Sequence, residues 1–314
     1  MVKLAKPKYK EILYEKKDWV ATLTINRPEK FNAYTLLTLD EMCDALHTAS
    51  WDDEVGVIVL TGAGKKAFCT GGDVKEYATK YTKKPRDFWK WCEIFERALH
   101  LLRHCGKPVI ARLNGIVAGG GNEVQMACDL AIAADHVEIL QVGTRVGSVA
   151  AGGATQWLPI IIGDRRAREM LFTCDRISAE KAKDWGLVNE VVPYDKLDDT
   201  IAEWSKKILE KFPECLRFTK AQVNFWKDLV WSLTWPSVRD WLSVHFSSQE
   251  PHEGMWAFVE KRPPAYIRLR QEAADGKSPE FKWGPWEKNC PSCGTKYLPS
   301  EFTHCGKCGA KLDK

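Results

Sequence analysis

Two segments of this chain share one design, in which a strand runs into a glycine turn and then into the start of a helix. They are VIVLTGAGKKAFCTGGDVKEY, residues 57–77, and PVIARLNGIVAGGGNEVQMA, residues 108–127. The first amides of a helix have no partner within it, and glycine lets another group approach them closely. Two such amides that converge on one point form an oxyanion hole. The alternative is that these are two ordinary strand-to-helix turns. That explanation would suffice for a single glycine turn, but it accounts less well for two of the same design.

Strands and helices alternate along the first half of the chain, and each strand ends at a turn residue. This alternation predicts an α/β crossover architecture. The expected strands are residues 19–28, 55–64, 107–115 and 129–135, and the expected helices are residues 36–52, 88–105 and one that begins near Asn122.

From Ser178 onward the pattern is helical throughout, and it is rich in tryptophan. We expect these aromatic side chains to pack helices on a core or on a second subunit. The prolines at 263 and 264 end the helical part. The predicted organisation is a main domain over residues 1–273, a linker over 274–288 and a small module over 289–314.

The last module carries two CxxC pairs, each followed by glycine. This spacing is typical of a zinc ribbon, in which four thiolates close a structural zinc site. Two disulfides are the alternative. His304 is not needed as a ligand. The predicted zinc ligands are Cys290, Cys293, Cys305 and Cys308.

The composition, 45% hydrophobic and 28% charged over 314 residues, is typical of a globular protein. A net charge of only +4 argues against a nucleic-acid partner. No run approaches the length of about 18 apolar residues that a membrane span needs, and the N-terminus has no apolar leader. We therefore expect a cytoplasmic enzyme. Seven further cysteines lie singly in apolar or helical segments, where free thiols behave as small hydrophobes: Cys43, Cys69, Cys92, Cys105, Cys128, Cys174 and Cys215.

From about Tyr14 to Tyr266 the chain resembles the crotonase (enoyl-CoA hydratase/isomerase) superfamily. The resemblance rests on NRPEKFNA, LTGAGKKAFCTGGDVKEY, KPVIARLNGIVAGGGNE, CDLAIAAD, ISAEKAKDWGLVNEVVP and EGMWAFVEKRPPAY. It implies a spiral of ββα turns with a C-terminal helical region, a homotrimer or hexamer, and an acyl-CoA substrate whose thioester enolate is stabilised. Coenzyme A enters as part of the substrate, and no redox cofactor is expected. The family lacks the cysteine module, for which we expect a role in docking a partner protein or stabilising the oligomer.

The resemblance implies that the oxyanion amides belong to Gly72 and Gly120. Phe258 and Lys261 match positions that reach the adenine or its phosphate, sometimes across a subunit boundary. The residues expected to contact coenzyme A are Lys30, Phe31, Asn32, Ala67, Lys75, Phe258 and Lys261.

Glu123 matches the first of the two catalytic glutamates of enoyl-CoA hydratases. A carboxylate at a helix start among apolar groups can be tuned for acid–base work, although the helix dipole alone also favours Glu there. The position of the second glutamate holds Gly143, so plain two-carboxylate hydration is not expected.

The segment around Gly143 resembles two branches of the superfamily. One comprises dihydroxynaphthoyl-CoA synthase and 2-ketocyclohexanecarboxyl-CoA hydrolase, which share Gln141, Gly143 and the VGS at 146–148 but carry an Asp where this chain has Ala150. The other is 6-oxocyclohex-1-ene-1-carbonyl-CoA hydrolase, which is similar in its Glu after the glycines and in GGAT and LP, residues 152–155 and 158–159. This second match is the closer one for the catalytic segment.

The resemblance implies addition of water to a cyclic enoyl-CoA, followed by hydrolytic C–C ring opening. Glu123 and Asp73 are the candidates for moving protons, and Gln141 for orienting water. Asp73 equally suits a helix N-cap. His245 and Tyr266 lie in the helical region that we expect to face the site, although a lone His on a helix is more often structural. The alternatives are a synthase or isomerase acting on the same enolate, and a non-catalytic scaffold subunit.

Overall fold

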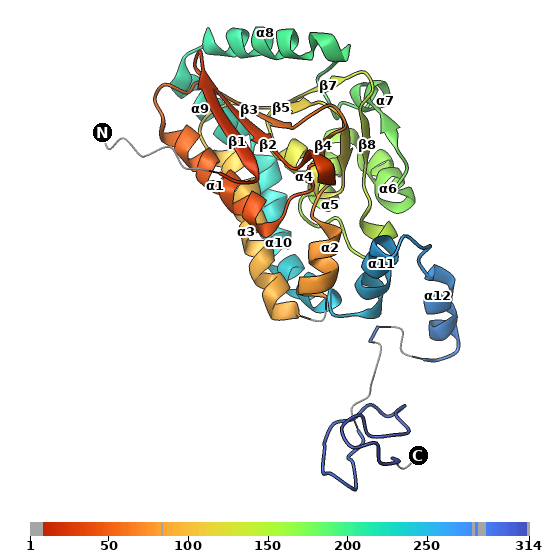
Figure 1. The fold of residues 1–314 in the computed structure, drawn as a ribbon. Coiled ribbons are helices and arrows are strands. Elements are labelled where there is room, and N and C mark those ends of the chain that lie inside the picture. The colour runs from red at the N-terminus through yellow and green to blue at the C-terminus, as the bar shows by residue number, and fades with distance from the viewer. Residues whose placement is uncertain (1–8, 83, 278–279, 282–286, 313–314) are drawn as a thin grey trace.

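Residues 9–312, apart from 83, 278–279 and 282–286, are described by a computed structural model (Figure 1). The predicted linker, residues 274–288, therefore lies partly outside the described residues.

The strands form two sheets. The larger one has the order β1-β2-β3-β5-β7-β10, and all its neighbours are parallel except β1 and β2. The smaller one has the order β4-β6-β8-β9, with only β9 antiparallel. The strands are β1 Ile12–Lys17, β2 Val20–Ile25, β3 Val57–Gly62, β4 Ala67–Cys69, β5 Val109–Leu113, β6 Ile116–Ala118, β7 Leu130–Ala134, β8 Glu138–Leu140, β9 Ile177–Ser178 and β10 Glu190–Val192.

Consecutive strands separate into different sheets. In the pairs β3–β4, β5–β6 and β7–β8, the first strand joins the larger sheet and the second joins the smaller one. A helix follows the second strand of the first two pairs. This repeat brings the turn after β4 and the turn after β6 side by side, because β4 and β6 are neighbours in the smaller sheet.

The helices surround this core, with α1 packed on β1 and β2 and α8 across β3, β5 and β7 (Figure 1). They are α1 Leu36–Trp51, α2 Val74–Glu76, α3 Pro85–His104, α4 Gly120–Ala127, α5 Ala154–Ile162, α6 Asp164–Thr173, α7 Ala179–Asp184, α8 Leu197–Leu209, α9 Pro213–Val223, α10 Phe225–His245, α11 Gln249–Val259 and α12 Tyr266–Ala274. Short 3₁₀ turns lie at η1 Pro28–Lys30, η3 Gly143–Arg145 and η4 Tyr194–Lys196, and η2 Tyr77–Tyr81 is a π-helical turn.

The local sequence explains the main elements. All six residues of β3 are buried, as expected of a central parallel strand covered on both faces. Helix α3 buries Phe88, Trp91, Phe95 and Leu99, which recur at the spacing of one helical face. The side chain of Thr35 caps α1 by accepting a hydrogen bond from the amide of Thr38, at 3.2 Å.

Some expectations from the sequence were wrong in detail. The helix expected from Asn122 begins at Gly120. Strands β1, β4, β6 and β8 were missed, and β10 interrupts the region expected to be helical throughout. Apart from β1, these strands have only three residues, too few to show alternation, and each is fixed by a neighbouring strand.

The tryptophans of α10 divide into two groups. Trp231 and Trp235 are buried and stacked, whereas Trp226 and Trp241 are exposed. The single cysteines are free, and six of them are buried as expected. Cys215, in α9, is exposed. Among the helices of the described residues, none has both the length and the apolar character that crossing a bilayer requires.

Candidate active site

The two glycine turns meet at one place. A Cβ on Gly71 would lie 2.8 Å from the nitrogen of Gly120, so the turn after β4 touches the first residue of α4. Tyr34 secures the first turn, because its nitrogen donates to the carbonyl of Gly71 and its carbonyl accepts from the amide of Asp73, both at 2.9 Å. No hydrogen bond found among the described residues uses the amide of Gly72 or of Gly120. Both amides therefore remain available to a ligand.

Neither glycine tolerates a side chain. A Cβ on Gly72 would overlap the hydroxyl of Tyr77, and a Cβ on Gly120 would overlap the hydroxyl of Tyr34. The preceding residue, Gly119, has a φ of 52°, a conformation that glycine adopts without strain. Gly119 thus serves the turn, and Gly72 and Gly120 allow the close approach of the two tyrosine hydroxyls.

Glu123 lies in the first turn of α4 and is only 6% exposed. Its Oε1 accepts a hydrogen bond from the amide of Ala154 at 3.3 Å. Burial raises the pKa of Glu123 to about 7, against a smaller lowering by the amides of Ala154 and Gly152. A carboxyl group with such a pKa can both take and return a proton near neutral pH.

A cavity brings these groups together, with an open volume of about 750 Å³ including its mouth. Gly72, Gly120, Glu123 and Gln141 all line it. One wall is aromatic and presents nearly parallel rings: Phe88 and Trp91 differ by 4° in plane, and Trp91 and Phe95 by 18°. The aromatic lining residues beside the two tyrosines are Phe88, Trp91, Phe95, Trp235 and Phe246.

Gln141 is fully buried, and neither its Oε1 nor its Nε2 has a partner among the described residues. Leaving a buried amide unpaired costs about 1–3 kcal/mol. An amide that lines the cavity in this state is suited to hold a water molecule or a polar group of a ligand.

Asp73 does not line the cavity. Its Oδ1 caps α2 by accepting from the amides of Lys75 and Glu76, at 3.1 and 3.2 Å, and its Oδ2 pairs with Arg27 at 3.1 Å. The structure therefore gives Asp73 the N-cap role that the sequence left open.

Gly143 begins the turn η3 and lines the cavity. A Cβ on it would lie 3.0 Å from the nitrogen of Ala150 and 3.1 Å from the carbonyl oxygen of Ser148. The chain that follows thus fills the space in which a second glutamate would begin. Tyr266 and His245 hold this segment from outside: Tyr266 donates to the carbonyl of Arg145 at 2.8 Å, and His245 Nε2 lies 3.3 Å from the carbonyl oxygen of Gly147. Neither lines the cavity.

The residues expected to contact coenzyme A fall into two groups. Asn32 and Ala67 are buried, and the Asn32 amide donates to the carbonyls of Ala63 and Ala67 at 3.0 and 2.7 Å. These two side chains therefore stabilise the surrounding loops from the protein interior. The other members of the set are exposed: Lys30, Phe31, Lys75, Phe258 and Lys261.

The carbonyl of Phe31 accepts a hydrogen bond from Thr70, at 3.2 Å, which joins this exposed segment to the first glycine turn. Phe258 lies in the last turn of α11, and Lys261 follows the end of that helix. Sequence reasoning missed Tyr34 and Tyr77, although Tyr77 ends the first glycine segment and Tyr34 directly follows NRPEKFNA. It also missed the aromatic face of α3, which the spacing of residues 88, 91 and 95 would have revealed.

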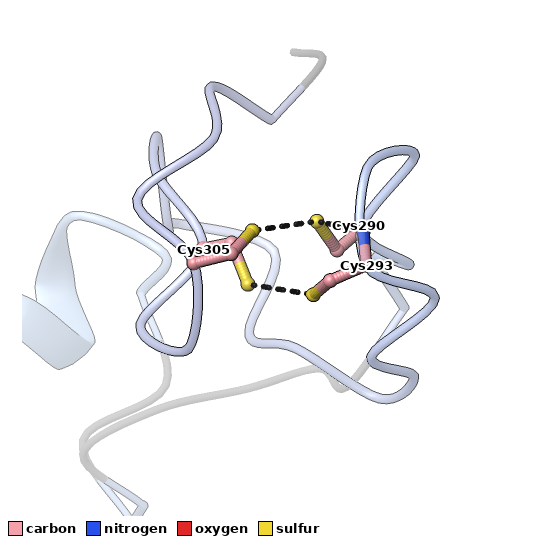
Figure 2. A group of neighbouring side chains, drawn as sticks. Cys290, Cys293 and Cys305 are labelled. Carbon is pink, nitrogen blue, oxygen red and sulfur yellow. Dashed lines mark hydrogen bonds between the residues drawn. The ribbon is translucent and has the colours of Figure 1, made fainter.

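The four cysteines of the C-terminal module point toward one centre, as Figure 2 shows for the three that it labels. Their Sγ atoms all lie within 4.8 Å of one another. The Sγ atoms of Cys290 and Cys308 are 3.6 Å apart, and those of Cys293 and Cys305 are 3.7 Å apart. Thiolates about 2.3 Å from a tetrahedral zinc would be separated by roughly 3.8 Å, whereas a disulfide needs about 2.05 Å. The four thiols therefore fit a tetrahedral metal site.

A family model described as enoyl-CoA hydratase/isomerase matches residues 15–268. An enoyl-CoA hydratase from Mycobacterium avium subsp. paratuberculosis K-10 is 25% identical, with 82% of this chain and 99% of that chain covered and a TM-score of 0.74. An enoyl-CoA hydratase from Bacillus anthracis is 32% identical over 82% and 99%, with a TM-score of 0.66. Pseudomonas aeruginosa DspI is 28% identical over 84% and 100%, with a TM-score of 0.67. With its paired sheets, its helical C-terminal region and this match over most of its length, the chain has the α/β crotonase fold and belongs to the enoyl-CoA hydratase/isomerase family.

Proposed function

We propose that this protein adds water to a cyclic enoyl-CoA or oxo-enoyl-CoA, as a hydratase, a ring-opening C–C hydrolase, or both. The observation that carries the proposal is a single buried carboxyl, Glu123, whose pKa is raised to about 7 in a cavity that also presents the amides of Gly72 and Gly120. A base and an oxyanion site in one apolar cavity suit chemistry through a thioester enolate.

In the proposed mechanism the two amides donate to the thioester oxygen as it becomes negative. Glu123 removes a proton from water, the hydroxide adds to the conjugated double bond, and the proton returns to the carbon next to the thioester. Gln141 orients the water through its unpaired amide. Asp73, which we first considered for proton transfer, is assigned to positioning the first turn, because its carboxylate is engaged outside the cavity.

Ring opening uses the same groups. A hydroxide adds to a ring ketone, the C–C bond beside it breaks, and its electron pair forms the thioester enolate at the oxyanion site. The new end is a carboxylic acid, and the enolate carbon takes a proton from Glu123. A site with one carboxylate and one neutral amide, in place of two carboxylates, supports this chemistry over simple hydration.

The aromatic lining of the cavity supports a cyclic acyl group. Phe88, Trp91 and Phe95 come from one face of α3 and stack on one another, and Phe246 stacks on Phe88 at 9°. A bulky apolar ring of a substrate buries more surface against such a lining than a short linear chain does.

For coenzyme A, we assign the nucleotide to the exposed segment of Lys30 and Phe31 with Lys75, and propose that Phe258 and Lys261 contribute within a homotrimer or hexamer. A cytoplasmic location is part of the proposal, since free cysteines persist in reducing compartments.

For the C-terminal module we propose a structural zinc ion held by the four thiolates, and a role in docking a partner protein or stabilising the oligomer. Deletion of residues 276–314 tests that role. Unchanged assembly, stability and partner binding would exclude it.

The test of function is mass spectrometry of the products formed from linear and cyclic enoyl-CoA and keto-CoA thioesters in H₂¹⁸O. One label without ring opening identifies a hydratase, and label in a new carboxylate identifies a C–C hydrolase. Products without label would favour a synthase or isomerase. Glu123→Gln should abolish turnover, and Glu41→Gln, a buried carboxylate on α1 outside the cavity, should retain it. If the wild-type protein is inactive on every thioester tested, the non-catalytic scaffold becomes the favoured alternative.

A further inference from the structure

Two tyrosine hydroxyls converge on the two glycines whose amides are free. The space that a Cβ of Gly120 would take holds the hydroxyl of Tyr34, and that of Gly72 holds the hydroxyl of Tyr77. Because a residue's nitrogen is only about 1.46 Å from its Cα, each hydroxyl lies within roughly 5 Å of one of these amides. Both tyrosines line the cavity.

The two hydroxyls lie near one another, because each tyrosine affects the pKa of the other. Each phenol has one proton to donate. Even where one proton is shared between the two hydroxyls, the other remains free for a ligand. The pair is therefore a donor site as well as a packing contact.

The tyrosine rings are held by the aromatic wall. Tyr34 stacks on Phe95 at 5.5 Å between centroids, and Tyr77 meets Trp91 edge to face at 5.0 Å. Because rings packed this way cannot rotate freely, the hydroxyls are set in place before a ligand binds. Fixed donors cost little reorganisation during a reaction.

We propose that the Tyr34–Tyr77 hydroxyl pair supplies a third hydrogen-bond donor, beside the amides of Gly72 and Gly120, to the thioester oxygen as it becomes negative. This inference rests on the proposed function and extends the oxyanion site from two backbone donors to a composite of backbone and phenol groups.

Donation, not proton transfer, is the role that the surroundings support. Burial raises the pKa of both phenols well above 10, and the nearby carboxylate of Glu123 raises it further. A phenolate formed here would be buried beside a negative group, which is costly. The hydroxyls therefore stay protonated while Glu123 moves the protons.

The test uses Tyr34→Phe, Tyr77→Phe and the double variant, each of which removes only oxygen. The matched control is Tyr81→Phe, because Tyr81 belongs to the same aromatic cluster but does not line the cavity. The probe is 4-(dimethylamino)cinnamoyl-CoA, whose absorption moves to longer wavelength when its thioester carbonyl is polarised. Wild type and Tyr81→Phe should show the full shift, and the double variant less than about half of it.

With a substrate found by the thioester panel, the double variant should lose about 10²–10³-fold in kcat, as for removal of one oxyanion donor, with KM changed little. A double variant with the wild-type shift and kcat would overturn the inference and leave the proposed function standing. A loss of kcat confined to substrates whose acyl group carries a second oxo group would also overturn the inference, because the tyrosine pair would then recognise that oxo group and not the thioester oxygen. A wild-type protein that neither shifts the probe nor turns over any thioester would remove the proposed function itself.

Discussion

Replacing Glu123 by glutamine should stabilise the protein at alkaline pH. Burial raises the pKa of this carboxyl from its ordinary value of 4.5 to about 7. Below about pH 4.5 the group is protonated in both the folded and the unfolded chain. As the pH rises, the unfolded chain releases its proton first, while folded Glu123 keeps its proton up to about pH 7. The unfolded state gains stability over this interval, so the free energy of unfolding falls.

The size of the effect follows from the two pKa values. At about 1.4 kcal/mol for each tenfold change, the full loss is about 3 kcal/mol. Between about pH 5 and pH 8, roughly 2.5 kcal/mol of it is realised. Glutamine keeps the shape of the side chain and cannot ionise, so the variant should be spared this loss.

The assay is urea denaturation of wild type and Glu123→Gln at both pH values. Any effect of glutamine on packing is present at both, so it cancels in the comparison. We expect the variant to gain roughly 2–3 kcal/mol relative to wild type on going from pH 5 to pH 8. Equal differences at the two pH values would refute the reasoning, because Glu123 would then titrate alike in the folded and unfolded chains.

Three further predictions concern the reaction and the metal site. For an essential base with a pKa of about 7, the ionised fraction and hence kcat/KM should rise about tenfold from pH 6 to pH 8, and a flat pH–rate profile would exclude Glu123 as that base. Gly143→Glu should not create hydration of a linear enoyl-CoA and should lower stability by about 1–3 kcal/mol in denaturation experiments, because its Cβ would crowd Ala150; gained activity would contradict this. Elemental analysis should find about one zinc per chain of the wild-type protein. The zinc content should be lower in Cys293→Ser and unchanged in the control Cys215→Ser, whose thiol is exposed in α9. Equal zinc contents in the two variants would contradict a four-thiolate site.

Elements with a strong period were predictable from the sequence. Strand β3 is a continuous apolar run, and α1 and α3 repeat apolar residues at helical spacing, so local pattern and final packing agree. The C-terminal cysteines were also predictable, because two CxxC pairs constrain geometry directly. Strands β6 and β10 were not, since three residues carry too little pattern.

The chemistry of the site was only partly accessible from the sequence. Glu123 was identified by its place after the glycines, but its raised pKa depends on burial by segments distant in the chain. The roles of Tyr34 and Tyr77 depend on two turns meeting, which no local pattern reveals. Asp73 suited a cap and a proton carrier equally well, and the two are distinguished only by its cap hydrogen bonds, its ion pair with Arg27 and its place outside the cavity.

The separation of consecutive strands into two sheets has a consequence for folding. The amides of Gly72 and Gly120 belong to successive turns of the spiral, and they adjoin only once β4 and β6 have paired. A chain that has formed its helices but has not yet paired β4 with β6 contains every catalytic residue, but these residues do not yet form an active site. Recovery of activity during refolding should therefore report the closing of the smaller sheet, and should lag behind the recovery of helical content.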